Sequence, residues 1–329
     1  MNKKLLSARL VAIAVLATAG GTALAAPYTL TTGAGDGSVT VGVDGYGSFG
    51  SSVGANSTDA LYNPIGAGVA AGTTYESGVA IRLGATAGAR TFLTSGDIGG
   101  SGSLTNPTVT GSTTTASSAF ALSGLSFSLS QVLTPLMTGS TQTGSVLTQT
   151  YSITNTTQGL LGFELVRYID GDLQFDGSIS DGGGRISLGG VEVLFETDTA
   201  TGSATSTTFV GISATGGTVP ATGRYEIDSF SGLRGRIVSG SALDDLIAGD
   251  GADIDQFIDL GGGYDVTLAL RNVFSLAAGA SSEYVTRTYF GAGTPESVVN
   301  PTPEPGSLAL LGLGLAGLAA RRQIGRAHV

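Results

Sequence analysis

The sequence predicts an all-β protein, an antiparallel β-sandwich flanked by a short apolar helix at each end. Three observations favour this class. Apolar and polar residues alternate over many short segments, which is the pattern of half-buried strands. Clusters of Gly, Ser, Asn and Asp bound these segments and supply turns. In the body of the chain no long segment places apolar residues at helical spacing, and no strict repeat indicates a solenoid or a propeller.

The clearest predicted strand covers residues 264–271. Its apolar face starts at Tyr264 and takes every second residue, whereas its other face starts at Asp265 and ends at Arg271, so we expect it to be buried on one side. In the run 191–196, Glu192 and Glu196 occupy the polar face, where solvated side chains are ordinary. Similar alternation predicts strands at 79–83, 120–122, 127–129, 151–153, 163–165, 191–195 and 284–290.

Three local features bear on how the body is organised. Gly, Ser, Thr and Asn gather between residues 96 and 118, which either divides the body into two domains or forms a long surface loop of one sandwich. The local helix candidate is 241–247, which contains Asp244 and Asp245. The segment 151–157, a strand followed by an Asn-Thr-Thr turn, resembles the strand-plus-turn units of bacterial immunoglobulin-like surface modules. That resemblance implies a sandwich of immunoglobulin-like or larger size.

Residues 1–25 have the three parts of a cleavable secretion signal. An apolar run at 10–19 follows a positively charged start, and it is far shorter than the ~20 residues that a membrane-spanning helix needs. Small residues at Ala23 and Ala25 then suit a signal peptidase, with Ala26 as the first residue of the exported body. The positive charges of the start are Lys3, Lys4 and Arg9.

Residues 303–322 carry three features in a fixed order: a proline motif, an apolar run at 308–320 and a basic pair. The motif is Pro303, Glu304 and Pro305, and the pair is Arg321 and Arg322. This order resembles the PEP-CTERM sorting tail of Gram-negative bacteria. At a rise of ~1.5 Å per residue the apolar run spans ~20 Å, against ~30 Å of hydrocarbon. We therefore expect a short transmembrane helix that anchors the chain only transiently.

The resemblance implies that a membrane-embedded exosortase recognises the proline motif and releases or transfers the protein. Because arginines near a membrane helix stay cytoplasmic, the body lies outside. We expect transient anchoring in the inner membrane and then a place on the cell surface or in the medium, with signal peptidase and the exosortase as partners. Residues 323–329 break the basic ending, and 324–329 resembles an in-frame translation of a sequencing adapter. We interpret this end as an artefact that includes His328, the chain's one histidine.

The composition of the body, residues 26–302, excludes several chemistries. It contains no Cys, His, Trp or Lys, which excludes cysteine nucleophiles, Ser-His-Asp triads, histidine-ligated zinc and iron–sulfur clusters. It carries 24 acidic residues against nine arginines, a net charge of −15. Such a balance disfavours nucleic acid and anionic lipid as partners.

The acidic stretch 170–181 is the candidate cation site. Asp170, Asp172 and Asp176 lie in a Gly-rich segment and could converge on Ca²⁺, which takes about six to eight oxygen ligands. The alternative is a pair of turns in which Asp and Gly cap strand ends. A second group faintly resembles the Gly-Asp runs of calcium-binding β-rolls but lacks their repeat, so a solvated loop is predicted. Its members are Asp244, Asp245, Asp250, Asp253 and Asp255. No cofactor besides this possible calcium is expected.

Three functional hypotheses follow. The first is an exported, exosortase-processed structural protein without enzymatic activity, associated with the extracellular polymer matrix of a biofilm. The second is a calcium-dependent carbohydrate-binding or adhesion module with an extracellular polysaccharide as partner. The third is a glycoside hydrolase, which needs two acids facing each other across a cleft. The candidate acids are Glu164, Glu192, Glu196 and Glu226.

Overall fold

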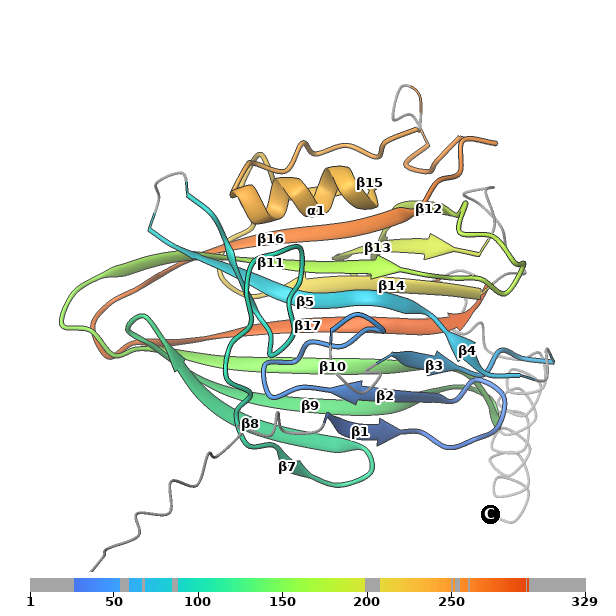
Figure 1. The fold of residues 1–329 in the computed structure, drawn as a ribbon, viewed down its shortest axis with the longest axis horizontal. Coiled ribbons are helices and arrows are strands. Elements are labelled where there is room, and N and C mark those ends of the chain that lie inside the picture. The colour runs from blue at the N-terminus through green and yellow to red at the C-terminus, as the bar shows by residue number, and fades with distance from the viewer. Residues whose placement is uncertain are drawn as a thin grey trace, which may run out of the picture.

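Two large antiparallel sheets pack face to face, and a smaller sheet and a helix complete the described fold (Figure 1). The computed structural model describes residues 27–53, 59–66, 69–84, 88–198, 208–249, 251, 255–259, 261–293 and 295. The long strands of both large sheets run along the long axis of the molecule (Figure 1). The all-β, sandwich-like architecture predicted from the sequence is confirmed.

The three sheets combine strands from distant parts of the chain. The eight-stranded sheet has the order β12 (Gly182–Leu188), β13 (Val191–Thr197), β14 (Thr208–Thr215), β17 (Ser281–Ala292), β10 (Thr141–Asn155), β9 (Leu125–Thr138), β8 (Thr115–Leu122) and β7 (Thr110–Gly111). The five-stranded sheet has the order β15 (Tyr225–Ser229), β16 (Val266–Leu276), β11 (Leu161–Gly171), β5 (Thr74–Leu83) and β6 (Thr91–Leu93). The four-stranded sheet is β1 (Tyr28–Thr31), β2 (Val39–Val43), β3 (Ala60–Tyr62) and β4 (Ala71–Gly72).

Two hydrophobic clusters fill the space between the large sheets. One contains Leu147 and Ile169, and it extends onto the four-stranded sheet through Tyr62. The other contains Ile153 and Leu165. Because side chains alternate along a strand, the same inward faces of β10 and β11 supply both clusters. The core therefore follows the period of two that the sequence shows.

A belt of buried polar side chains separates these two clusters. It includes Gln131, Gln149, Arg167 and Thr286, each at an inward position. Arg167 is fully buried and donates to the hydroxyl oxygens of Ser77 (2.8 Å) and Thr288 (3.0 Å), which are neutral acceptors. Burial lowers the pKa of Arg167 to about 10, so the guanidinium stays charged at neutral pH.

Asn155 holds together two of the places where the chain crosses between the large sheets. Its side-chain amide donates to the carbonyl oxygen of Gly159 (2.7 Å), on the way from β10 to β11, and to that of Leu276 (2.9 Å), on the way from β16 to β17. Its side-chain oxygen accepts from the backbone N–H of Thr157 (2.9 Å). Since buried backbone groups need partners, this one residue satisfies both turns.

Each strand predicted from alternation overlaps an observed strand, but two expectations about burial are wrong. Residues 266–270 of β16 are buried on both faces, not one. One face joins the core between the sheets through Leu268, and the other packs with the helix through Ala269. Glu196 is fully buried and not solvated, because its face of β13 also carries Leu194 of the core.

The described helix lies before the predicted one. Helix α1 is Phe230–Ser239, and the predicted segment 241–247 is not helical. Leu233 and Ile237 are one turn apart and both buried, and Gly240 ends the helix in a left-handed conformation with φ 80°. Residues 241–247 run beside β15, where the backbone N–H of Ile227 donates to the carbonyl oxygen of Leu246 (3.0 Å).

Both predicted targeting segments lie outside the described residues. These are the signal at 1–25 and the tail at 303–322, which includes the apolar run at 308–320. Within the part of the chain that the structure describes, no helix has the length and apolar character needed to cross a membrane.

Candidate functional site

Strand β11 carries two acidic residues on the face that α1 covers. Glu164 and Asp170 are separated by an even number of positions, so the period of two places them on the same face. Val166 and Tyr168 lie between them and pack with Leu233 of the helix. Both acids are 2% exposed. The groups around them, however, differ in charge.

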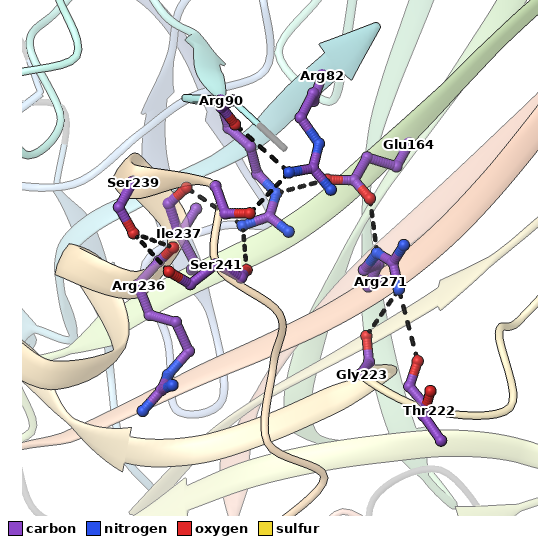
Figure 2. Close-up of polar contacts among 12 residues, drawn as sticks. Arg82, Arg90, Glu164, Thr222, Gly223, Arg236, Ile237, Ser239, Ser241 and Arg271 are labelled. Carbon is purple, nitrogen blue, oxygen red and sulfur yellow. Dashed lines mark hydrogen bonds and ion pairs between the residues drawn. The ribbon is translucent and has the colours of Figure 1, made fainter. Parts of the chain in front are cut away.

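Three arginines surround Glu164 (Figure 2). Its Oε1 is 2.8 Å from Nη2 of Arg82 and 2.8 Å from Nε of Arg90, and its Oε2 is 2.7 Å from Nε of Arg271. Arg82 and Arg271 come from β5 and β16, the two neighbours of β11. Burial alone would raise the pKa of Glu164, but the charges and hydrogen bonds of Arg90 and Arg271 outweigh it and hold the pKa below its ordinary value.

The same arginines hold the segments that follow α1 and precede β15 (Figure 2). Arg82 donates to the carbonyl oxygen of Gly240 (2.7 Å), and Arg90 donates to that of Ser241 (2.8 Å). Arg271 donates to the carbonyl oxygen of Gly223 (3.2 Å). Carbonyl groups at a helix end lack partners within the helix, and cations there also suit the helix dipole. Glu164 therefore orients three arginine side chains, each of which holds a neighbouring backbone carbonyl group.

A hollow of about 210 Å³ opens beside this cluster. It is lined by Arg82, Glu164 and Arg271, and the rings of Phe163 and Phe274 form its apolar wall. These two rings stack with centroids 4.9 Å apart and an angle of 4° between their planes. The hollow thus combines guanidinium groups with a flat apolar surface.

Two further hollows continue from the first. A hollow of about 240 Å³ shares Arg271 with it and is also lined by Arg224 and Glu192. A hollow of about 350 Å³ shares Glu192 with the second and is lined by Arg185 and Gln256. Because neighbouring hollows share lining residues, the three lie next to one another. We call the run of three hollows the arginine groove.

The second and third hollows contain the most exposed arginines of the groove. The side chains of Arg224 and Arg185 are 33% and 23% exposed. Both guanidinium groups lie over the ring of Tyr225, at 5.1 Å and 4.3 Å from its centroid. Glu192 accepts from Nε of Arg185 at 2.5 Å, and Arg224 lies 3.9 Å from it. The ring keeps both cations in place at the surface.

A second group of acids, which we call the carboxyl cluster, consists of Asp170, Asp181 and Glu196. Asp181 and Glu196 lie on neighbouring segments, directly before β12 and within β13, and are 1% and 0% exposed. The two carboxyl groups lie close enough to shift each other's pKa, and a hydrogen bond between them requires a proton on one of them. A Cβ atom at Gly171 would collide with the Glu196 carboxyl, so glycine permits this close approach to β11.

The carboxyl cluster has no arginine partner among the described ion pairs. Burial raises the pKa of Asp181 to about 8 and that of Asp170 to about 9, and it raises the pKa of Glu196 well above its ordinary value. Nearby carboxylates add to each shift, for example Asp265 beside Asp170. Oδ1 of Asp170, Oδ1 of Asp181 and both side-chain oxygens of Glu196 receive no hydrogen bond from a donor group. The three acids are therefore held largely protonated at neutral pH.

The structure brings together only part of the predicted calcium loop. Asp172 is half-buried and close enough to Asp170 to contribute to its raised pKa. Asp176 is exposed, and its Oδ1 accepts from the backbone N–H of Ser178 (2.8 Å), as expected of a turn residue. Among the described residues no group of three or more acidic, histidine or cysteine side chains could hold a metal ion. Calcium binding here stays a prediction.

The second predicted acidic group has structural partners where it is described. Asp245 accepts from the backbone N–H groups of Gly223 (2.5 Å) and Arg224 (2.7 Å), and Asp244 pairs with Arg236 (2.8 Å). The Asp245 contacts hold the backbone at Arg224, which lines the arginine groove. Asp250 and Asp253 lie outside the described residues.

The four acids considered for a hydrolase occupy different surroundings. Glu164 and Glu192 line the arginine groove, and each is paired with arginine. Glu226 is buried beside Arg236, with 3.0 Å between Oε1 and Nε. Glu196 does face another acid, Asp181, but neither of the two lines the hollows of the arginine groove. Sequence reasoning missed Asp181 as a partner, because the antiparallel register between β12 and β13 is what places it there.

The comparisons with known proteins address the tail and the fold separately. No curated protein matches the sequence. A polysaccharide lyase structure has 10% identity and a TM-score of 0.40, and the alignment covers 80% of this chain and 33% of that one, so this chain spans about a third of its length. A galactose mutarotase-like protein from Lactobacillus casei ATCC 334 has 10% identity and a TM-score of 0.33, with 80% and 100% coverage.

Residues 301–323 match the PEP-CTERM protein-sorting motif, in the region where the sequence predicts such a tail. This segment includes the proline motif Pro303, Glu304 and Pro305 and the basic pair Arg321 and Arg322, all outside the described residues. The motif implies recognition by an exosortase, export and processing to the cell surface. The chain therefore carries a PEP-CTERM sorting motif behind a β-sandwich body.

Proposed function

We propose that this chain is a non-catalytic structural protein of the cell surface, sorted by an exosortase and then held in the extracellular polymer matrix. The observation that carries the proposal is the sorting motif at 301–323. Its position after the sandwich body suits a tail that is removed or transferred once the body is outside. The body then acts as a folded unit at the surface.

The placement of the acids supports a non-catalytic body. A glycoside hydrolase needs two carboxyl groups that flank a substrate, and Asp181 and Glu196 are the facing pair in the described fold. Both are sealed inside the sandwich, with exposed fractions of 1% and 0%. A sugar cannot reach this pair without separating β12 and β13 from β11.

The sorting step is tested in the bacterium that carries the gene, with and without its exosortase. The variant Glu304→Gln removes the charge of the motif, and Glu283→Gln removes an exposed charge of β17 as a matched control. Immunoblots of the membrane, surface and medium fractions should show the control protein shortened and outside the membrane. We expect the Glu304 variant to stay in the membrane at its unprocessed length.

Two outcomes would contradict the proposal. If the unaltered chain leaves the membrane in cells without the exosortase, the tail is not what sorts it. If the processed protein stays in the medium and never appears in the polymer fraction extracted from the cell surface, association with the matrix is wrong, even though sorting is right.

A carbohydrate-binding or adhesion function is the second candidate, and the arginine groove favours it. The groove lies open on the body, and its lining includes charged, amide and aromatic groups of the kind that recognise sugars. The two functions are compatible, because a matrix protein needs a surface that holds the polymer.

A further inference from the structure

We infer that the arginine groove is a binding site for a carboxylated polysaccharide. The inference rests on the proposed function and deepens it, because it names the chemistry of the polymer that the body would hold. The groove consists of three hollows that share Arg271 and Glu192 at their borders. Three adjacent hollows of this kind suit several successive sugar units of one chain.

The groove concentrates positive charge in an otherwise acidic body. Its lining contains four of the nine body arginines and two glutamates, although the body as a whole carries a net charge of −15. The arginines are Arg82, Arg185, Arg224 and Arg271, and the glutamates are Glu164 and Glu192. An anion entering the groove therefore meets an excess of guanidinium groups. Such a local field favours anionic ligands that carry widely spaced charges.

Hydrogen-bond donors also outnumber acceptors around Glu164 on β11. Glu164 is the one carboxylate that Arg82, Arg90 and Arg271 share. Nε of Arg82 and Nη2 of Arg90 are buried without an acceptor, so they add positive charge beneath the groove but do not themselves contact a ligand. A planar carboxylate matches the two parallel N–H groups of a guanidinium, which makes a sugar acid a better partner than a neutral sugar.

The rest of the lining suits the body of a sugar ring. Asn272 and Thr215 line the second hollow, and Gln256 and Ser187 line the third. These side chains donate and accept hydrogen bonds, as hydroxyl groups require. Phe163 and Phe274 also line the first hollow. Nucleic acid fits less well, because its dense phosphates would meet the net negative charge of the surrounding body.

Binding is tested with the purified full chain and three polymers of equal length: polygalacturonate, neutral dextran and single-stranded DNA. Isothermal titration calorimetry at low and at physiological salt should show binding of polygalacturonate that weakens with salt, and no binding of dextran. In the double variant Arg185→Gln/Arg224→Gln we expect affinity to fall about tenfold or more. The matched control is Arg287→Gln on β17, which removes an arginine outside the groove lining.

A third variant keeps the test independent of folding. Glu192→Gln removes the negative charge that competes for Arg185 and Arg224, so polygalacturonate should bind about threefold more tightly. Damage to the fold cannot raise affinity, and equal unfolding temperatures will show that the double variant stays folded. The inference is overturned if polygalacturonate does not bind, if the double variant binds as well as the control, if Glu192→Gln does not tighten binding, or if DNA or dextran binds as tightly.

Failure here and failure of the proposed function can be told apart. A protein that reaches the cell surface but does not bind polygalacturonate leaves the sorting proposal intact and removes the site. A protein that binds polygalacturonate but is never sorted leaves the site intact and removes the proposed place of action.

Discussion

Glu164 and Asp170 occupy the same strand and the same face, and both are 2% exposed, yet their pKa values shift in opposite directions. Glu164 lies among three arginines, and its pKa falls below the ordinary value. Asp170 has acidic neighbours and no ion pair in the described structure, and its pKa rises to about 9. Burial penalises both carboxylates, so the neighbouring charges decide which one stays ionised.

The two ends of β11 therefore suit different roles. At the Glu164 end the carboxyl group is ionised and the three arginines make the net charge positive. This end also opens to a hollow of about 210 Å³. The carboxyl cluster at the other end is buried, and bound protons rather than arginines neutralise its acids. A ligand can contact the charged arginines at the Glu164 end, whereas the acids at the Asp170 end are protonated and carry no charge. This contrast is why the arginine groove, and not the acid-rich end, is our binding site.

The largest effect is expected from Glu164→Gln. The change leaves three arginines with no carboxylate, and breaking a buried ion pair from one side costs about 3–5 kcal/mol. Urea unfolding followed by circular dichroism measures the loss. Glu283→Gln, at an exposed position of β17, should stay within about 0.5 kcal/mol of the unaltered protein. A loss below about 1 kcal/mol in the Glu164 variant would mean that the arginines do not depend on it.

The carboxyl cluster should make stability fall as pH rises. The unfolded chain releases these protons near pH ~4, whereas Asp181 and Asp170 keep them in the folded state up to about pH 8 and 9. The folded state binds more protons across this window, so raising the pH favours unfolding by ~1.4 kcal/mol per pH unit for each extra proton. Urea unfolding between pH 5 and pH ~8 measures this slope. Glu164 acts oppositely and loses its contribution only as pH falls below its ordinary pKa.

The variant Glu196→Gln sharpens this prediction. An amide has the size of the carboxyl group but does not titrate, so the slope of stability against pH should be shallower than in the unaltered protein. We expect the stability of the variant, measured relative to the unaltered protein, to be higher at pH ~8 than at pH 5. If the free energies of unfolding of the variant and the unaltered protein differ by the same amount at both pH values, Glu196 does not carry the raised pKa.

The smallest effect is expected from Arg234→Gln. Arg234 contributes to the electrostatics of Asp170, but its side chain is 27% exposed and lies 3.5 Å from the buried Glu76, whose pKa burial raises. Because Glu76 can take up a proton when this cation is removed, losing the long, partly solvated pair should cost about 1 kcal/mol and leave no uncompensated buried charge. Urea unfolding should therefore show a much smaller loss than in Glu164→Gln. A loss of stability as large as that of Glu164→Gln would mean that the buried acids at the Asp170 end require the charge of Arg234.

Local pattern predicted the strands but not the depth of their burial. Alternation located β5, β10 and β17 because side chains on a strand point to opposite faces in turn. The same pattern predicted a solvated Glu196, which is wrong, because other segments cover what the pattern leaves polar. Helix α1 was missed since its sequence has two glycines and only Leu233 and Ile237 as its buried residues.

The arginine groove and the carboxyl cluster were beyond local reasoning for a different reason. Arg90, Glu164 and Arg271 are 74 and 107 positions apart along the chain, and strand pairing brings them together. Asp181 was not weighed as a partner of Glu196, because that contact depends on the register of β12 against β13. Candidate acids could be named from the sequence, but their protonation could not.

The sequence by itself determined the β class, the sorting motif and the exclusion of cysteine and histidine chemistry from the body, because these depend on composition and on short, contiguous patterns. Only the tertiary structure decided which carboxylates are charged and where the arginines gather. Electrostatic energy depends on distance and burial in space, and neither follows from separation along the chain.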